Sequence, residues 1–242
     1  RAGAPVADGF GGPDGFGYRF IDSDEPGGPA FAWNDLSATG TRIDSLAGDD
    51  EISEPIPLGF SFEFYGRTFD AVRVCTNGFL SFNDTVPEYV NQPLPGRGAP
   101  PNLVAPFWDD LDFKGFPRAA YARDASSFTV QYTDVEPYEG TGRFTFQVTL
   151  FASGEIAFRY LSMSGDTGSA TVGIQNDTRD TGLQGAFNTP YAHDGLATRG
   201  FNEPQWLTAS PTSGRLLGGE SLDVTVRIDA SGLAGGTYHG TV

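Results

Sequence analysis

The feature that most constrains the fold of this chain is a period-two alternation of large apolar side chains, most of them phenylalanine. In IPLGFSFEFYG (residues 56–66), Phe60, Phe62 and Phe64 alternate with small or charged residues. Successive side chains of a β-strand point to opposite faces, so this spacing places the three rings on one face. No window shows the spacing of an amphipathic helix. The alternation therefore predicts an all-β protein.

Turn residues divide the alternating pattern into short strands. DAVRVCTNGFLSF (70–82) predicts a hairpin, because Asn-Gly between two alternating runs favours a tight turn. Further strands are expected at 127–135, 143–151, 155–161 and 170–176. The ASG turn at 152–154 joins two of them as a second hairpin. Many short strands separated by turns are typical of an antiparallel sandwich or barrel, and we predict an antiparallel β-sandwich.

Composition changes twice along the chain and suggests three segments. Residues 1–16 are rich in glycine and proline and are expected to be irregular, whereas 17–200 carry the phenylalanine pattern. Residues 204–242 contain no phenylalanine and show three alternating runs separated by proline or glycine turns. Three strands are too few to close a sandwich that normally takes roughly 100 residues. We therefore expect 204–242 to be a partial immunoglobulin-like β unit.

Charge, hydropathy and cysteine content exclude several classes of function. The net charge is −16 with a pI near 4.3, so the chain repels phosphate backbones and a nucleic-acid partner is not expected. No apolar run is long enough to span a bilayer, so membrane insertion is not expected either. Cys75 is the single cysteine and has only His193 and His239 as candidate partners for a catalytic thiol. We interpret Cys75 as a small buried apolar residue.

The acidic end of NLVAPFWDDLDF (102–113) is the strongest candidate site. An apolar run leads into Asp109, Asp110 and Asp112. Carboxylates at this density suit Ca²⁺, although they can also end a strand by accepting backbone N–H bonds, or form a general acid–base pair. In a strand, Asp110 and Asp112 would share one face. We interpret the three aspartates as the end of an edge-proximal strand beneath Trp108 and as a candidate calcium site.

A second acidic cluster lies in DSDEPGG (22–28). Asp22, Asp24 and Glu25 resemble half of a calcium loop, but the spacing and the distal glutamate of an EF-hand are missing. The alternative is a solvated turn. An exposed Trp or Tyr could also form a carbohydrate-binding platform, and Trp33 and Trp108 flank acidic or loop segments.

The sequence contains one misleading catalytic motif. GDTGSA (165–170) matches the signature of aspartic proteases, and DTG recurs at 180–182. That chemistry needs two aspartates close enough to share a proton, each at the end of an apolar strand. Neither copy follows such a strand, so we interpret both as loop turns. No nucleophile elbow or zinc-protease motif occurs. We predict that the chain is not an enzyme and has no catalytic residues.

Four motifs occur in an order that resembles nidogen-like (NIDO-type) extracellular β domains. They are VRVCTNGFLSF, NLVAPFWDDLDF, FQVTLFASGEIAFRY and ATVGIQN. The resemblance covers roughly residues 17–200 and is closest to bacterial versions found beside secreted proteases and in large surface proteins. The segment 204–242 resembles the second half of an immunoglobulin-like repeat of bacterial exoproteins.

The resemblance implies a non-catalytic extracellular module of a larger secreted or cell-surface protein of bacteria. Such a module would act in adhesion or interaction with a protein or glycan partner, or as an accessory domain to a protease. RAGAPVADG at the N-terminus does not begin with methionine and fits a processed, exported protein. The partial tail unit supports an alternative, a structural subunit of an extracellular filament or surface layer that self-assembles by β-strand addition. No cofactor other than calcium is expected.

Overall fold

The computed structural model describes residues 9–202, 207–211 and 214–228. Within these ranges the regular elements are strands, and there is no helix long and apolar enough to cross a membrane. Internal contacts divide the chain into two units, residues 1–202 and 203–242, and each is described separately.

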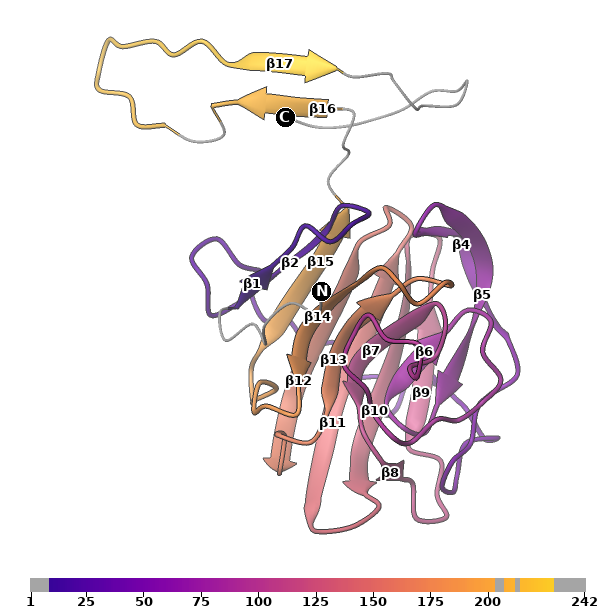
Figure 1. Cartoon of the computed structure of the whole chain (residues 1–242). Helices are drawn as coiled ribbons and strands as arrows, with labels where there is room; N and C mark the ends of the chain where they lie inside the picture. The colour runs from indigo at the N-terminus through magenta and orange to yellow at the C-terminus, as the bar shows by residue number, and fades with distance from the viewer. Residues whose placement is uncertain (1–8, 203–206, 212–213, 229–242) are drawn as a thin grey trace. The chain divides into compact units, whose positions relative to one another are not determined.

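The larger sheet of the first unit has nine strands, all paired antiparallel. They are β1 (Phe10–Gly11), β2 (Tyr18–Asp22), β3 (Thr41–Arg42), β8 (Leu111–Asp112), β9 (Ala119–Arg123), β10 (Ser127–Pro137), β11 (Gly142–Phe151), β12 (Ile156–Gly165) and β15 (Ala197–Asn202). Their order is β1-β2-β15-β12-β11-β10-β9-β3, and β8 pairs with the end of β10. Figure 1 shows the long strands β10, β11 and β12 side by side in this sheet. The three-stranded meander of β10, β11 and β12 forms the centre of this sheet.

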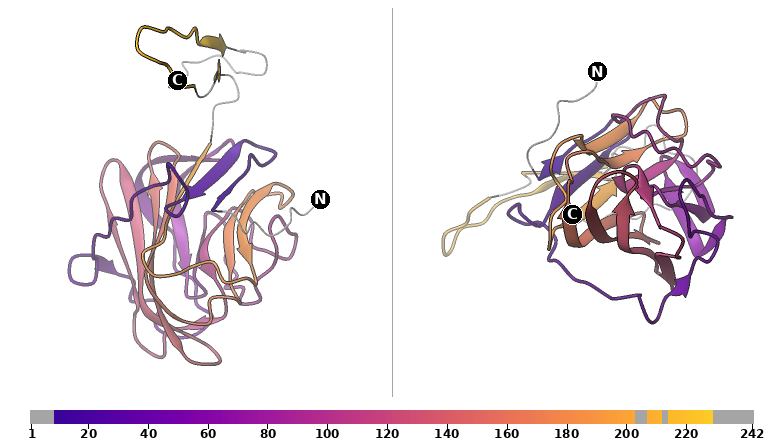
Figure 2. Two further views of the ribbon diagram at one scale, coloured as in Figure 1. Left: turned by 90° about the vertical axis from the view of Figure 1, so that its left-hand side faces the viewer. Right: turned by 90° about the horizontal axis from the view of Figure 1, so that it is seen from below.

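The second sheet of this unit has six strands and is also antiparallel. They are β4 (Ile56–Phe64), β5 (Arg67–Cys75), β6 (Phe79–Ser81), β7 (Leu103–Trp108), β13 (Thr171–Gln175) and β14 (Gly182–Phe187). The order is β14-β13-β7-β6-β5-β4. The two sheets form the two layers of a sandwich, which Figure 2 shows from two further sides, and the predicted fold class is confirmed.

Two tyrosines of the larger sheet cross the core and donate hydrogen bonds to the backbone of the smaller one. The hydroxyl of Tyr132 donates to the carbonyl oxygens of Cys75, at 2.9 Å, and Phe79, at 3.3 Å. The hydroxyl of Tyr160 donates to the carbonyl oxygen of Pro106 at 2.7 Å. Both tyrosines are fully buried. Each bond satisfies a phenolic hydroxyl that would otherwise be costly to bury, and fixes one sheet against the other.

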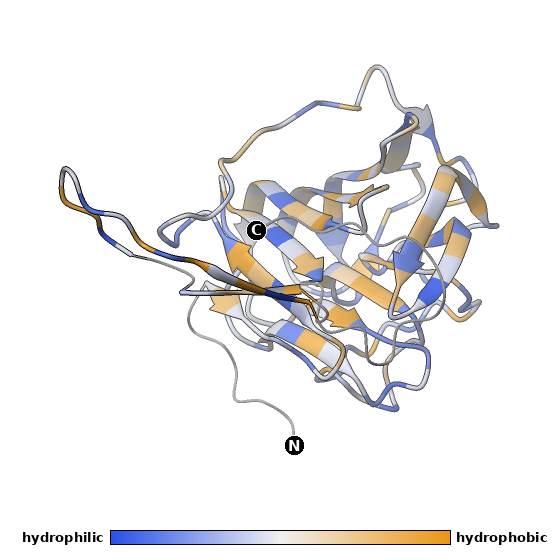
Figure 3. Cartoon of the chain, turned by 90° about the horizontal axis from the view of Figure 1, so that it is seen from above, coloured by the Kyte–Doolittle hydropathy of each residue, from blue (hydrophilic) through white to orange (hydrophobic). Residues whose placement is uncertain are grey.

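Phenylalanine side chains fill the core between the two sheets, around these two tyrosines. The ring centroid of Phe107 lies 4.8 Å from that of Phe144 and 5.7 Å from that of Phe146. Phe62 and Phe64 of β4 are also fully buried, as the alternation predicts. Apolar and polar residues alternate along the strands of the sandwich (Figure 3). The period-two pattern of the sequence therefore indicates which face of each strand is directed to the core.

The predicted hairpin at 70–82 is confirmed as β5 and β6, which pair antiparallel around the Asn-Gly turn. Cys75, at the end of β5, is fully buried, and burial raises the pKa of its thiol. The interpretation of this cysteine as a small core residue is therefore confirmed.

The prediction that β7 lies close to a sheet edge is wrong. This strand is paired on both sides, with β13 and β6, in the interior of the six-stranded sheet. All six of its residues are buried, so it carries an unbroken apolar run of the kind that central strands show. The strand ends at Trp108, and Asp109 and Asp110 lie in a turn before β8. The three aspartates therefore do not share one strand.

The second unit is described only in part. β16 (Leu207–Ser210) and β17 (Thr225–Ile228) form an antiparallel two-stranded sheet. The last of the three strands expected for an immunoglobulin-like unit falls in 229–242, outside the described residues. Six apolar side chains of this unit are exposed by 45–67%: Leu216, Leu217, Leu222, Val224, Val226 and Ile228.

The close approach of Gly78, in the turn of the β5–β6 hairpin, to the backbone of β7 can be tested by mutation. Gly78 has φ of +73°, and a Cβ atom there would lie 1.9 Å from the carbonyl oxygen of Phe107. We expect Gly78→Ala to lower the free energy of unfolding by about 3 kcal/mol or more, because strain and a backbone clash act together. Gly115→Ala is the matched control, since Gly115 also has a positive φ but no atom within 4 Å of a Cβ.

Gly115→Ala should lower the free energy of unfolding by only roughly 1–2 kcal/mol, the cost of the left-handed conformation alone. Urea denaturation of both variants measures the difference. Equal destabilisation of the two would contradict the proposed clash with β7.

Candidate acidic site at the β7–β8 turn

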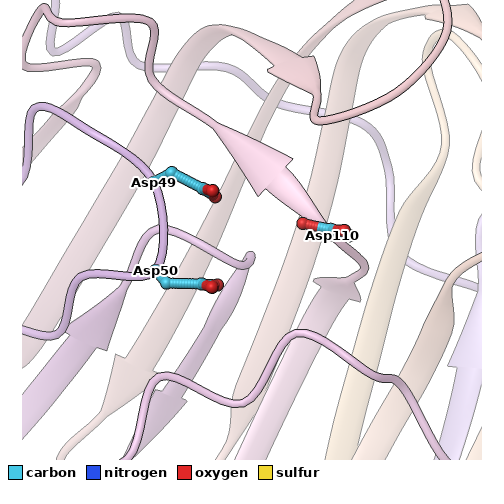
Figure 4. Close-up of side chains that lie close together, drawn as sticks. All are labelled: Asp49, Asp50 and Asp110. Carbon is cyan, nitrogen blue, oxygen red and sulfur yellow. The ribbon is translucent and has the colours of Figure 1, made fainter.

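Three carboxylates converge where the loop before β4 meets the turn between β7 and β8. Asp49, Asp50 and Asp110 each contribute one oxygen, and these oxygens all lie within 4.8 Å of one another. Figure 4 shows Asp49 and Asp50 on neighbouring positions of one loop, with Asp110 opposite them. The site therefore joins segments about sixty residues apart in the sequence.

Backbone pairing holds the two loops together. Asp49 and Asp112 form an isolated antiparallel bridge, and the N–H of Phe113 donates to the carbonyl oxygen of Gly48 at 3.1 Å. The carboxylate of Glu51 accepts the N–H of Gly48 at 2.8 Å and so closes the loop on itself. These contacts place the side chains of Asp49 and Asp50 beside the turn.

The buried side chain of Asn77 connects both loops to the β5–β6 hairpin. Its Nδ2 donates to Oδ1 of Asp50 at 2.7 Å, and its Oδ1 accepts the N–H of Leu111 at 3.0 Å. Its backbone oxygen accepts the N–H of Asp109 at 3.3 Å. The amide orientation is fixed by chemistry, because the N–H of Leu111 needs an acceptor. Sequence reasoning identified this asparagine only as a turn residue and missed its role at the site.

Burial and the crowding of negative charge raise the pKa of two of the aspartates. Burial, followed by the charges of Asp49 and Asp50, raises the pKa of Asp110 to about 6. Burial, followed by the charges of Asp50 and Asp112, raises the pKa of Asp49. In addition, Oδ1 of Asp49 is buried and accepts no hydrogen bond from the described residues. The site thus combines mutual repulsion with a buried oxygen that lacks a donor.

The negative charge of these three carboxylates can be reduced by a proton or by a hard cation such as Ca²⁺. Ca²⁺ is bound by six to eight oxygen atoms, which three carboxylates together with water molecules can supply. A proton on Asp110 would remove one of the three charges. Both events relieve the same repulsion, so they should compete.

The other two predicted ligands of the WDDLD segment make separate contacts. Oδ1 of Asp109 accepts the N–H of Asp110 at 2.9 Å, and its second oxygen accepts the hydroxyl of Ser169. Asp112 forms an ion pair with Lys114 at 2.9 Å. Burial acts to raise the pKa of Asp112, but the hydrogen bonds and charge of Lys114 outweigh it and the net shift is downward. Of the predicted trio, only Asp110 joins the converging carboxylates.

The residues predicted in the DSDEPGG segment also serve different partners. Buried Asp22 accepts the hydroxyl of Tyr191 at 2.9 Å and the N–H of Asp24 at 3.0 Å. The carboxylate of Asp24 lies 3.0 Å from Nε2 of His193. Glu25 accepts a backbone N–H at 3.2 Å. The segment is a hydrogen-bonded turn that follows β2, and its three carboxylates are not grouped in the described structure.

The two DTG copies lie in separate turns. Oδ1 of Asp166 accepts the N–H of Gly168 at 2.8 Å. Oδ1 of Asp180 accepts the side-chain amide of Asn176 at 2.9 Å and the hydroxyl of Thr178 at 2.7 Å. Each aspartate thus stabilises its own loop, as the loop-turn interpretation expects. Neither is hydrogen-bonded to the other, as an aspartic-protease pair would require.

Comparisons with known proteins agree with the motif order. A family model described as NIDO related matches residues 28–217. The chain is similar to nidogen of Drosophila melanogaster, with 41% identity over 65 residues. That match covers 27% of this chain and 4% of the length of the nidogen. No solved structure was found to match the chain.

Proposed function

The chain belongs to the NIDO-related family, and on that basis we propose that it is a non-catalytic interaction module of a larger extracellular protein. The observation that carries the proposal is the family match over most of the sandwich. The side chains that sequence reasoning flagged for catalysis support it, because Asp166 and Asp180 serve their own turns. We further propose a bacterial secreted or surface protein, in which the module acts in adhesion or beside a protease.

This proposal predicts where the native polypeptide is found and how large it is. An antibody raised against the sandwich should detect a protein larger than 25.8 kDa in the medium or on the surface of intact source cells. Surface protein should disappear after mild protease treatment of those cells, whereas a cytoplasmic marker should persist. Detection of the protein only after cell lysis would contradict an extracellular role.

We propose that the carboxylates of Asp49, Asp50 and Asp110 bind a calcium ion. The burial and the neighbouring negative charges that raise the pKa of Asp110, and the buried oxygen of Asp49 without a donor, support a cation at this position. Because the pKa of Asp110 is raised in the folded state, its ionised form destabilises the fold. The favourable contribution of the neutral form is lost as the pH rises through about 6. A bound cation would restore this contribution to the stability of the fold above pH 6.

Thermal melting tests the calcium site. At pH 7.5, calcium at about 100 times its Kd should stabilise the wild type by about 2.7 kcal/mol, a rise in Tm of roughly 5–10 °C over chelator. Near pH 4.5 the rise should vanish, because Asp110 is then mostly protonated. Asp110→Asn should melt higher than the wild type in chelator at pH 7.5 and should gain little from calcium.

Asp180→Asn is the control, because Asp180 is hydrogen-bonded within its own turn and lies outside the converging carboxylates. It should keep the calcium response. Identical melting of the wild type in calcium and in chelator at pH 7.5 would exclude the proposed site.

A second candidate function is a subunit of an extracellular filament or surface layer. The described strands of the second unit, β16 and β17, pair with each other, and Val226 and Ile228 of β17 are 45% and 67% exposed. An isolated two-stranded ribbon is marginally stable in water, and its edges can accept a strand from another chain. Addition of strands between copies would cover these apolar side chains.

Light scattering after size-exclusion chromatography separates the two candidates. A filament subunit should change from monomer to larger species between low micromolar and several hundred micromolar protein. Ile228→Lys should suppress that change, because a charge would be buried in the new sheet. Leu161→Lys is the control, since Leu161 is 41% exposed on the sandwich and should have no effect. A strict monomer at every concentration would exclude self-assembly.

A further inference from the structure

A groove lies on the outer face of the nine-stranded sheet, away from the core. Its volume is about 340 Å³. Residues from β10, β11 and β12 form its floor, and the segment before β3 forms one wall. The lining residues used in the argument below are Trp33, Asp124, Thr129, Gln147, Thr149 and Arg159. The floor residues alternate with core residues of the same strands, so they point outward by the period of the strand. A volume of this size is within the range of ligand sites.

Buried glutamines hold the wall of the groove in place. Gln147 donates to the carbonyl oxygen of Asn34 at 2.7 Å, and Oε1 of Gln131 accepts the N–H of Leu36 at 2.9 Å. The two glutamines are 2% and 1% exposed and are hydrogen-bonded to each other at 2.8 Å. This irregular segment is therefore fixed to the sheet by specific bonds, and the position of Trp33 within it is set.

The floor of the groove contains a guanidinium that lacks a carboxylate partner. Nη1 of Arg159 donates to Oγ1 of Thr149 at 2.9 Å, and no carboxylate of the described residues lies within ion-pair distance. The nearby carboxylate of Glu155 is paired with Arg199 at 3.0 Å. Burial lowers the pKa of Arg159. Arginine remains charged in proteins, so its remaining donors favour an anionic acceptor.

A second groove of about 330 Å³ beside β9 lacks this feature. There, Arg118 donates to the carbonyl oxygens of Phe113 and Asp134 and pairs with Glu136. Its guanidinium is occupied by groups of the protein itself. The unpaired guanidinium therefore distinguishes the groove that contains Arg159.

The aromatic wall completes the chemistry of the site. Trp33 is half-buried, and its ring stacks against Phe31 with centroids 6.4 Å apart and an interplanar angle of 11°. A supported aromatic ring presents a flat apolar surface to the C–H groups of a sugar ring. The hydroxyl groups of Thr129 and Thr149, which contact each other at 2.9 Å, add polar groups to the floor.

We propose that this groove binds a saccharide that carries a carboxylate, with a sugar ring on Trp33 and the carboxylate on Arg159. Two parallel N–H···O bonds from a guanidinium give a carboxylate both affinity and orientation. Arg123 and Asp124 also line the groove and offset each other in charge, so the net charge of the chain, −16, limits the ligand to few negative charges. The proposal rests on the interaction role proposed above and names its ligand class.

Calorimetry on the purified full chain tests this proposal with two disaccharides. The first joins glucuronic acid to xylose, and the second replaces the glucuronic acid by glucose. The wild type should bind the acidic disaccharide at least about tenfold more tightly than the neutral one. Arg159→Gln should remove this preference, whereas Trp33→Ala should weaken the binding of both.

Arg143→Gln is the matched control, because Arg143 lies on β11 but pairs with Glu136 outside the groove. It should bind as the wild type does. Thermal melting of each variant checks that the fold is intact, and Arg159→Lys provides a conservative second variant that should keep part of the preference.

Three outcomes would overturn the proposal. The first is no saturable binding of either disaccharide by the wild type. The second is unchanged binding in a folded Arg159→Gln or Trp33→Ala variant. The third is tighter binding of a short peptide through its terminal carboxylate with the same dependence on Arg159. Each outcome leaves the extracellular role intact, because that role is tested by the location and size of the native protein.

Discussion

The structure depends on aromatic packing between two antiparallel sheets that are fixed in register by two buried phenolic hydroxyls. Tyr132 and Tyr160 each donate across the core to backbone oxygens of the opposite sheet. Apolar packing alone is not directional, so rings could slide past one another. The hydroxyls allow one arrangement, because any other leaves buried polar groups without partners. The chain leaves the smaller sheet at the end of β7 and pairs with the larger sheet at β8, and the turn between these two strands carries Asp110 of the acidic site.

Much of the sandwich could be predicted from the sequence, because strand alternation is a local pattern. The segments 127–135, 143–151 and 155–161 overlap β10, β11 and β12, although β10 continues to Pro137 and β12 to Gly165. The position of β7 could not be predicted, because a fully apolar run does not show which strands lie on its two sides. Asp110 was identified as a candidate, but its neighbours Asp49 and Asp50 lie in a loop with no regular pattern. Contacts between distant loops leave no local signal in one sequence.

The two candidate sites use different parts of the sandwich. The acidic site is formed by turns at strand ends, where loops are free to carry carboxylates without disturbing the core. The groove with Trp33 and Arg159 uses the outward face of three central strands, where every second residue is available. In the sequence, Gln131 and Gln147 have the pattern of ordinary outward-facing polar residues of strands. Only the folded chain reveals that they hold a wall of the groove.

The burial of Cys75 gives the chain an internal reporter of its own opening. The thiol is the only one in the sequence and is completely shielded, with its pKa raised by burial. The thiol packs with Phe79, Leu94 and Trp108 in a cluster separate from the core between the sheets, so an alkylating reagent can reach it only in molecules in which that cluster has opened. The labelling rate under native conditions therefore follows the opening of this cluster, which includes Leu94 and Ala99 of the loop between β6 and β7. Opening of this second cluster can thus be measured without adding a probe to the protein.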